Sequence, residues 1–249
     1  MKDSAVLAVA GCKGGVGKTT TAINIGAVVA RDHTVLVIET DLATANVSDF
    51  LELKCNPERD TTLHDVLAEE AAIEDATYEA PGGVHVVPSG ATIEGFVAAR
   101  TDRIGTVVEK VRSQYDLVLL DTPAGVSRET LMPMAIADGV ILVATPRLSA
   151  IRDVKKTAEL VERVGGNAVG LVLTHTGTGN APPGERLATF LDVKLLGEVP
   201  DDQTVPHSQD AGRPVVEFAP SSPPARAYEA IVDRLLNRQA AEQVSGRDQ

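Results

Sequence analysis

A glycine-rich turn near the start of the chain has the residue types and spacing that hold phosphate groups. An apolar run from Ala5 to Ala10 leads into the stretch GCKGGVGKTT, residues 11–20, and a helix is predicted from about Thr19 to Arg31. Glycines let consecutive backbone N–H groups curl around an anion, and the helix N-terminus adds its positive dipole. Lys18 supplies a positive charge for the β- and γ-phosphates, and the Thr19 hydroxyl can ligate Mg²⁺. The stretch therefore predicts a nucleoside triphosphate site.

The loop differs from the usual G-x-x-x-x-G-K-[ST] pattern in one position and carries an additional lysine. Cys12 stands where the first glycine would be, and the run from Gly14 to Gly17 keeps the loop flexible. Lys13 lies five residues before Lys18. A single chain does not need that second lysine to hold phosphate, and the alternative is a solvated loop charge. With it, the run KGGVGKTT resembles the deviant Walker A loop of the ParA/MinD ATPases.

Further segments resemble the same family, over about residues 4 to 238, and most closely its MinD-like branch. Residues 35–41, VLVIETD, resemble a second strand that ends in an acid-x-acid pair, and Asn46 stands at the switch position that follows. Residues 115–125, YDLVLLDTPAG, resemble the Walker B strand and second switch. Residues 199–202 and 212–215 resemble the late loop on the base side of the nucleotide.

The resemblance assigns roles to residues of this sequence. Asp41 would orient the attacking water, and Lys13 would cross to a partner subunit and contact its phosphates. The catalytic set is then Lys13, Lys18 and Asp41, and the metal set is Thr19, Asp41 and Asp121. The nucleotide set is Lys13, Gly14, Gly15, Val16, Gly17, Lys18, Thr19, Thr20, Gly125, Thr174, His175, Pro200 and Asp201.

Several of these positions have a second interpretation. Asp41 could cap the next helix, and Asp121 could be an ordinary strand-end acid, although an unpaired charge at the end of an apolar strand is costly. Glu39 is expected to bond the second switch or the Mg²⁺ shell. Gly125 can offer its N–H to the γ-phosphate. A guanine-binding site would need the motif N-K-x-D after the predicted strand 168–174, and the chain lacks this motif, so ATP is favoured over GTP. Family members usually carry Arg or Asn near this position, and His175 departs from that pattern.

Composition limits the classes of function. The 249 residues hold 35 Asp and Glu against 23 Lys and Arg, a net charge of −12. This balance is typical of an acidic cytosolic protein or of adaptation to a salty cytosol, and it disfavours nonspecific DNA binding by the whole surface. Cys12 and Cys55 form no C-x-x-C pair, and the five histidines lack metal-ligand spacing, so no protein-held transition metal is expected. No apolar stretch approaches a membrane span, and a cytoplasmic location is expected.

Alternating strand and helix patterns predict the fold. Continuous apolar runs predict strands at about 4–10, 34–39, 84–88, 116–121, 139–145, 168–174 and 193–199, and helical patterns occupy 101–114 and 150–164. The prediction is an α/β fold with a doubly wound, mostly parallel sheet and helices on both faces, as in P-loop NTPases. Residues 1–238 would form one ATPase domain, followed by a polar, disordered tail at 239–249.

The resulting interpretation is a Mg²⁺-dependent ATPase, slow without a partner, that acts as an ATP-driven dimerisation switch for intracellular positioning through a protein partner. Residues 237–249 lack the apolar face and cationic rim of a membrane-binding helix, so direct membrane binding is not expected. Arg226, Arg234 and Arg238 alternate with acids and give DNA binding only weak support. Three alternatives share the fold: an iron–sulfur cluster carrier, a synthase of the cobyric-acid or dethiobiotin type, and an ATP-binding scaffold with negligible turnover.

Overall fold

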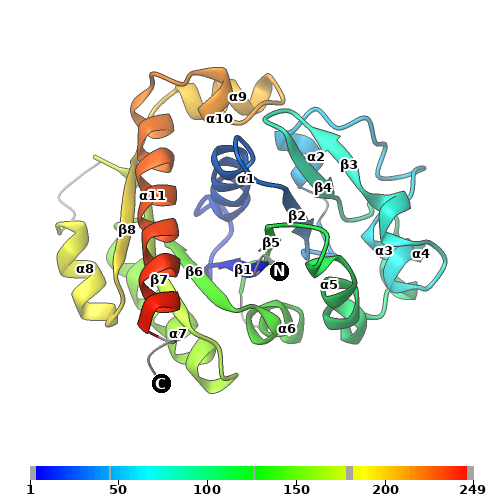
Figure 1. Cartoon of the computed structure of the whole chain (residues 1–249), viewed down its shortest axis with the longest axis horizontal. Coiled ribbons are helices and arrows are strands. Elements are labelled where there is room, and N and C mark those ends of the chain that lie inside the picture. The colour runs from blue at the N-terminus through cyan, green and yellow to red at the C-terminus, as the bar shows by residue number, and fades with distance from the viewer. Residues whose placement is uncertain (1–3, 45, 126, 178–181, 246–249) are drawn as a thin grey trace.

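The fold is built on one eight-stranded sheet, seen here in a computed structural model (Figure 1). The structure describes residues 4–44, 46–125, 127–177 and 182–245, without the side chains of residues 128, 148 and 238–245. The strand order is β3-β4-β2-β5-β1-β6-β7-β8, and neighbouring strands are parallel except for β3 and β4. The strands are β1 Ala5–Ala10, β2 Val35–Glu39, β3 Tyr78–Ala80, β4 Val84–Val87, β5 Leu117–Asp121, β6 Gly139–Ala144, β7 Ala168–Thr176 and β8 Leu195–Pro200.

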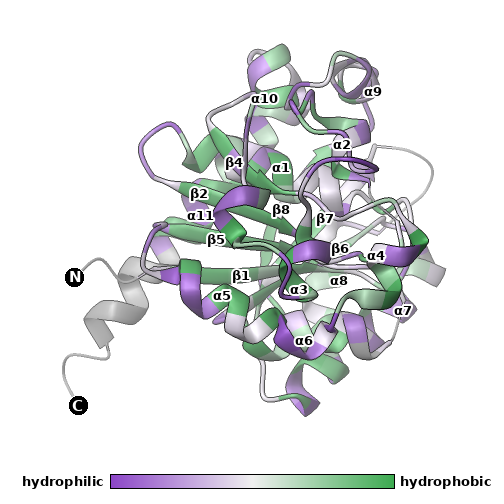
Figure 2. Ribbon diagram, turned by 90° about the vertical axis from the view of Figure 1, so that its right-hand side faces the viewer, coloured by the Kyte–Doolittle hydropathy of each residue, from purple (hydrophilic) through white to green (hydrophobic). Residues whose placement is uncertain are grey.

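The central strands are continuous apolar runs, ending in an acid in β2 and β5, because helices cover both faces of the sheet. Every residue of β2, β5 and β6 is buried. Figure 2 shows the sheet as a band of hydrophobic residues inside the molecule. Alternate strand residues belong to two separate apolar clusters, as with Val118 in one and Leu119 in the other. The predicted doubly wound sheet with two covered faces is confirmed.

Helices α1, α10 and α11 pack on one face, where Ile25, Val215 and Ile231 join the same cluster. Helices α3, α5, α6, α7 and α8 supply Leu63, Val107, Met134, Val154 and Leu187 to the cluster on the other face. The helices are α1 Lys18–Val29, α2 Val47–Phe50, α3 Leu63–Leu67, α4 Ile93–Ala98, α5 Ile104–Arg112, α6 Arg128–Ile136, α7 Leu148–Arg163, α8 Gly184–Leu191, α9 Thr204–Asp210, α10 Val215–Phe218 and α11 Pro223–Ser245.

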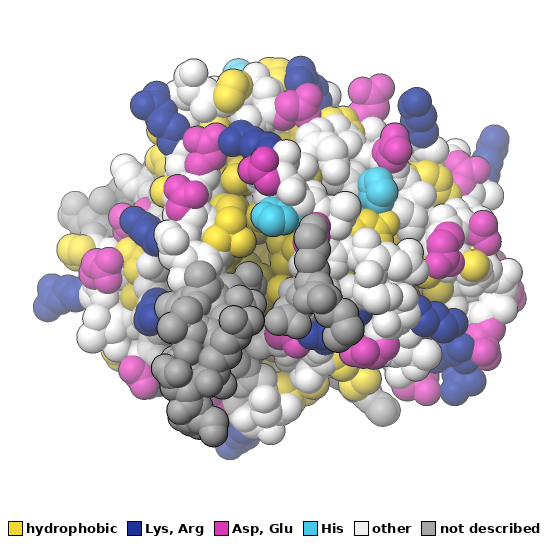
Figure 3. Space-filling model, viewed as in Figure 1, with side chains coloured by type: hydrophobic (Ala, Val, Ile, Leu, Met, Phe, Trp, Pro, Cys, Tyr) yellow, Lys and Arg dark blue, Asp and Glu magenta, His cyan; other side chains and the backbone are white. Residues whose placement is uncertain are grey.

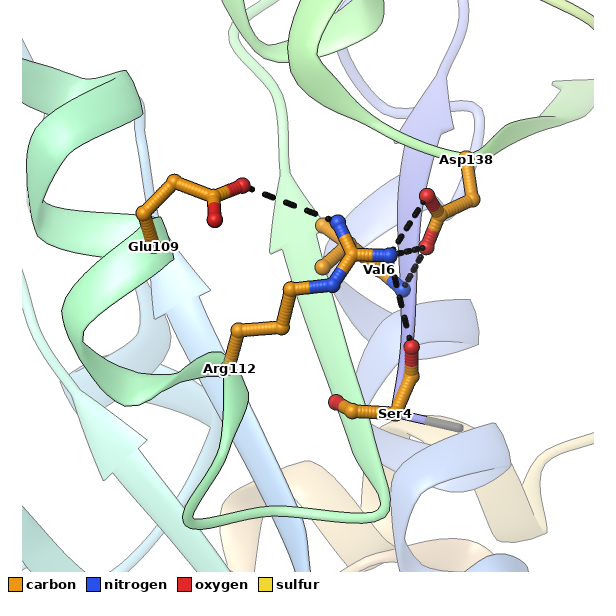
Figure 4. A network of polar contacts seen from close by, with 5 residues as sticks. All are labelled: Ser4, Val6, Glu109, Arg112 and Asp138. Carbon is orange, nitrogen blue, oxygen red and sulfur yellow. Dashed lines mark hydrogen bonds and ion pairs between the residues drawn. The ribbon is translucent and has the colours of Figure 1, made fainter. Parts of the chain in front are cut away.

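A polar network ties elements together at the amino end of the sheet (Figure 4). Arg112 at the end of α5 donates from Nη2 to both carboxylate oxygens of Asp138, each at 2.7 Å. Asp138 Oδ2 also accepts the backbone N–H of Val6 in β1 at 2.7 Å. These bonds fasten α5 and the start of β6 to β1 at the edge opposite the phosphate-binding loop.

The structure contains elements that the sequence analysis did not predict. Strand β3 was not predicted, because three partly exposed residues are too few to show a periodicity. The backbone of α11 stays helical to Ser245, past the proposed boundary at residue 238. The disordered tail at 239–249 stays a prediction, since its side chains and residues 246–249 lie outside the described part of the chain. Among the described helices none is long and apolar enough to span a bilayer.

Candidate functional site

The phosphate-binding loop connects β1 to α1 and leaves the start of α1 open to a ligand. Gly15 and Gly17 have φ angles of 73° and 85°, in the left-handed region that glycine adopts without strain. Gly17 is the N-cap of α1, and no side chain caps the helix. The first N–H groups of α1 are therefore available to an anion, together with the positive end of the helix dipole.

Lys18 lies at the start of α1 with its side chain largely buried. Its Nζ is 3.4 Å from the backbone carbonyl of Lys13 across the loop. Burial lowers the pKa of Lys18, whereas the nearby carboxylates of Asp121 and Asp41 raise it. The ammonium therefore lies inside the loop among acidic groups, where it can neutralise phosphate charge.

Thr19 and Asp121 form the part of the site suited to Mg²⁺. Thr19 Oγ1 donates to Asp121 Oδ2 at 2.6 Å. Asp121 is buried, and its Oδ1 has no hydrogen-bond partner among the described residues. Burial raises the pKa of Asp121 to about 6, against the lowering effects of the Thr19 hydrogen bond and Lys18. A carboxylate oxygen beside a threonine hydroxyl fits the oxygen donors that Mg²⁺ prefers, directly or through water.

Asp41 lies just beyond the end of β2 and lines the same cavity as Lys18 and Asp121. Its Oδ1 accepts the Thr44 N–H at 3.3 Å. The alternative that Asp41 caps the next helix is wrong, because α2 begins at Val47 and its N-cap is Asn46. Asp41 is therefore open to a ligand in the cavity, as orientation of a water molecule would require.

Glu39 has a different role from the one expected from the sequence. Its fully buried carboxylate accepts N–H groups from Asn46 at 2.5 Å, Val47 at 3.0 Å and Ser89 at 2.9 Å. Burial raises the pKa of Glu39 to about 8, although these three donors lower it. These partners differ from the expected bond to the second switch, and the expected place of Glu39 in the Mg²⁺ shell stays a prediction. Glu39 holds Asn46 and Val47, at the end of a segment called here the Asp41 loop, of which the structure describes residues 41–44, 46 and 47.

A cavity of about 530 Å³ opens at the carboxyl edge of the sheet beside the loop. It collects most of the residues assigned to the nucleotide and the metal. Those that line it are Gly14, Gly15, Gly17, Lys18, Thr19, Thr20, Asp41, Asp121, Thr174, His175, Pro200 and Asp201. Val16 and Lys13 line a neighbouring cavity of about 360 Å³ instead.

The far end of the main cavity has the mixed lining that a nucleobase needs. Thr174 Oγ1 donates to the Val16 carbonyl at 2.7 Å, so it braces the loop. His175 has a positive φ of 51°, and its Nδ1 lies 3.2 Å from Asp201 Oδ1. Sequence reasoning missed Val205 and Pro206, which add apolar surface there. It also missed Gln209, whose amide donates to Thr20 Oγ1 at 2.9 Å from α9.

Gly125 lies outside that lining and is already engaged. Its N–H donates to the carbonyl of Cys12 at 2.9 Å, and its φ is 91°. The same Cys12 contacts α7 through its thiol, which lies 2.9 Å from the Asp153 carbonyl and 2.7 Å from Thr157 Oγ1. For Gly125 to reach a γ-phosphate, its bond to Cys12 has to be exchanged.

Lys13 turns away from the cradle that Lys18 occupies. Its Nζ pairs with Asp153 Oδ2 of α7 at 2.9 Å, and its side chain is 47% exposed. This hydrogen bond lowers the pKa of Asp153. Sequence reasoning missed Asp153, and no sequence signal marks it, because it lies 140 residues from Lys13. Lys13 is therefore the loop cation that faces outward.

The chain resembles known proteins along nearly its whole length. Residues 3–236 match the ParA family model, which is described as the NUBPL iron-transfer P-loop NTPase. An uncharacterized ATP-binding protein of Methanocaldococcus jannaschii is 34% identical, over 92% of this chain and 87% of its own length. The septum site-determining protein MinD of Synechocystis is 30% identical, over 92% of this chain and 88% of its own length.

Two solved structures have the same fold and are similar in sequence. The cell division ATPase MinD of Pyrococcus furiosus superposes with a TM-score of 0.89 at 30% identity, covering 94% of this chain and 99% of its own. MinD of Pyrococcus horikoshii, solved with Mg-ADP, gives a TM-score of 0.88 at 29% identity, covering 93% and 96%. The chain therefore belongs to the ParA/MinD family of P-loop ATPases.

Proposed function

We propose that this protein is a Mg²⁺-dependent ATPase whose ATP-bound form pairs with a second copy and whose hydrolysis step separates the pair. In this proposal the cycle positions a cargo inside the cell through a protein partner, and turnover is slow until the partner binds. The main support for pairing is the direction of Lys13. The phosphate-binding loop has two lysines: Lys18 points into the loop, whereas Lys13 points outward to Asp153.

The nucleotide part of the proposal is supported by the chemistry of the cavity. Lys18 and the open start of α1 would hold the phosphates, and Thr19 and Asp121 would hold the metal and its waters. When bound there, Mg²⁺ would neutralise charge that develops on the transferred phosphoryl group. Asp41 would orient the attacking water in line. The Mg-ADP bound to the Pyrococcus horikoshii MinD agrees with this choice of ligand.

The dimer part follows from the position of Lys13. Among the described residues, Lys13 is half exposed and pairs with one partly exposed carboxylate, so it can exchange partners at little cost, because exposed ion pairs contribute little. Across an interface, its ammonium would reach the phosphates of the second copy, as an arginine finger acts in trans. ATP would then favour pairing through both phosphate groups, and loss of the γ-phosphate would weaken it.

The positioning part rests on the relatives, which are named for septum placement and cell division. The surface in Figure 3 supports a protein partner over bulk nucleic acid, because Lys and Arg side chains on that face are interspersed with Asp and Glu. DNA binding through a local patch stays a weaker proposal, and direct membrane binding is not proposed. The cytoplasm is the proposed location.

The test is the oligomeric state of the purified protein in ADP and in ATP, measured by light scattering. An Asp41→Ala variant should accumulate as a dimer in Mg-ATP because it binds but does not hydrolyse. Adding Lys13→Ala to it should return the protein to a monomer while ATP still binds, whereas Lys18→Ala should abolish ATP binding itself. A double variant that still dimerises would overturn the dimer part, and absence of Mg-ATP hydrolysis in the wild type would overturn the ATPase.

The description of the matched family raises the iron–sulfur carrier as the second candidate. The sequence offers it only Cys12 and Cys55, and Cys12 is engaged with α7 through its thiol. Iron and sulfide analysis of anaerobically purified protein distinguishes the two: a stoichiometric cluster would replace the positioning proposal with the carrier. Stimulation of ATP turnover by a small carboxylic acid would instead favour the synthase.

A further inference from the structure

His64 is a buried histidine whose backbone is fixed on both sides. It lies in α3 with 2% of its surface exposed. Thr62 and Asp65 form a reciprocal capping box at the start of α3, and the Leu63 N–H donates to the Pro88 carbonyl at 2.9 Å. These bonds attach α3 to the end of β4, beside the carboxyl edge of the sheet. The histidine therefore extends from a rigid base.

The ring makes one well-formed hydrogen bond, to the Asp41 loop. His64 Nε2 lies 2.9 Å from the backbone carbonyl of Leu42. A carbonyl can only accept, so Nε2 carries the hydrogen, and the ring is the neutral tautomer with an N–H at that position. Nδ1 is buried and has no partner among the described residues. Burial lowers the pKa of His64, in agreement with a neutral ring.

Glycine backbones enclose the other side of the ring. A Cβ at Gly90 would lie 2.5 Å from His64 Nδ1, and one at Gly95 would lie 2.9 Å away. Phe96 of α4 adds an edge contact, with 6.3 Å between ring centroids. Helices α3 and α4 pack together at the β3–β4 end of the sheet (Figure 1). The ring therefore has little room to move, and its N–H is aimed at Leu42.

Ser89 connects this contact with the other anchor of the Asp41 loop. Ser89 Oγ lies 3.3 Å from His64 Nε2, and Ser89 N–H donates to Glu39. Glu39 in turn holds the N–H groups of Asn46 and Val47. The loop is thus fastened near both ends, at Leu42 by His64 and at Asn46 by Glu39, and both anchoring side chains are buried.

We propose that His64 is a positioning residue for ATP hydrolysis, which fixes the Leu42 carbonyl and thereby the direction of the adjacent Asp41 carboxylate. This inference rests on the proposed ATPase function and on Asp41 as the residue that orients water. His64 touches neither nucleotide nor metal in this role. The His64 N–H pairs with the Leu42 carbonyl. Without this bond the buried carbonyl would have no hydrogen-bond donor, which costs free energy, and the Asp41 loop would move to recover one.

The expected consequence is a loss of turnover without loss of binding. A displacement of about 1 Å in a group that orients a reactant costs on the order of 10²-fold in rate. The phosphate-binding loop is formed by different residues, so the affinity for nucleotide should not change. His64→Ala should therefore lower kcat about 10-fold or more at an unchanged KM, with an unchanged Kd for Mg-ADP.

Three matched variants separate positioning from packing. His64→Gln places an amide N–H near the position of Nε2, and it should restore kcat to within about 3-fold of the wild type. His64→Leu fills the space without a donor and should be as slow as His64→Ala, so a folded slow variant is available if the alanine variant unfolds. Val66→Ala opens space in the same helix, with no bond to the Asp41 loop, and should keep its kcat.

The measurement is steady-state Mg-ATP hydrolysis of the full chain, with Mg-ADP titrated by calorimetry for each variant. Wild-type turnover in His64→Ala and His64→Leu would overturn the inference and leave the ATPase standing. Equal loss in His64→Gln or in Val66→Ala would also overturn it, since packing alone would then explain the effect. A wild-type chain no faster than Lys18→Ala would overturn the proposed ATPase itself, and the inference with it.

Discussion

Glu39 and Asp121 lie opposite each other in register at the carboxyl ends of β2 and β5, yet their carboxylates have different partners. Glu39 accepts three backbone N–H groups. Among the described residues, the Asp121 carboxylate accepts a hydrogen bond from the Thr19 hydroxyl and keeps its other oxygen buried without a partner. A buried polar atom without a partner is costly unless a ligand completes it. The two carboxylates therefore differ in function: Glu39 fixes the Asp41 loop, whereas Asp121 keeps an oxygen that could accept the metal of the proposed ATPase.

Asp121→Asn should lower the rate of ATP hydrolysis without lowering the stability of the fold. The amide oxygen can still accept from Thr19, but the negative charge that would hold Mg²⁺ and its waters is gone. Mg-ATP hydrolysis should fall by about 10²-fold or more, because metal stabilisation of the reaction is worth several kcal/mol. Denaturation of the nucleotide-free variant at pH 8 should show equal or greater stability than the wild type. Unchanged hydrolysis would remove Asp121 from the metal site.

Stability of the nucleotide-free protein should fall as the pH rises through the range in which these two acids titrate. In unfolded chains Asp and Glu have pKa values of about 3.9 and 4.3. Burial raises the folded pKa of Asp121 to about 6 and that of Glu39 to about 8. The folded state then binds more protons than the unfolded state, so the free energy of unfolding decreases with rising pH between about 4 and 8.

Glu39→Gln isolates the larger of these effects. Urea denaturation in EDTA from pH 5 to pH 9 should show a shallower decline for Glu39→Gln than for the wild type. The control is Glu94→Gln, which removes one negative charge at an exposed position. Its free energy of unfolding should change with pH as steeply as that of the wild type. Parallel curves for Glu39→Gln and the wild type would show that Glu39 is ionised throughout, held so by its three backbone donors.

The sequence predicted the sheet well because its strands are buried on both faces. Val35 to Glu39 and Leu117 to Asp121 are continuous apolar runs that end in acids, and they form neighbouring central strands. The short helices were not predicted: α2 has four residues and α3 has five, too few for a helical period to appear. Their placement depends on anchors such as Glu39 and Pro88, which are distant in sequence.

The phosphate cradle was also predictable, because a local pattern encodes it, whereas the residues that brace it were not. Lys18 and Thr19 belong to one continuous motif whose geometry the glycines set. Gln209 of α9 bonds Thr20 in the cavity, Asp153 of α7 pairs with Lys13, and His64 of α3 bonds the Asp41 loop. Each is an ordinary polar residue in its own segment, and only the packing of the fold gives it a partner.

Asp153→Asn should favour pairing in ATP without weakening the fold. Lys13 and Asp153 are both partly exposed, so their ion pair contributes too little to shift the melting temperature measurably. Removing the carboxylate's charge releases Lys13 from its partner within the chain and leaves it available to a second copy. Light scattering in Mg-ATP, with Asp41→Ala present to prevent hydrolysis, should show the dimer forming at lower protein concentration. Weaker pairing would mean that Asp153 belongs to the interface itself.

Gly17→Ala and Gly14→Ala should differ sharply although they change the same loop. Gly17 has a φ of 85°, and a Cβ there would lie 3.3 Å from Thr174 Cγ2, which is tight. Left-handed backbone costs an alanine roughly 1–2 kcal/mol, so Gly17→Ala should lose about that much stability in urea denaturation. A Cβ at Gly14 meets nothing within 4 Å, and the stability of Gly14→Ala should stay close to that of the wild type.

The strain at Gly17 would also displace the first turn of α1, so Gly17→Ala should bind Mg-ADP about 10-fold more weakly or worse. Equal stability of the two variants would show that the loop relaxes out of the left-handed region at Gly17 when no nucleotide is bound.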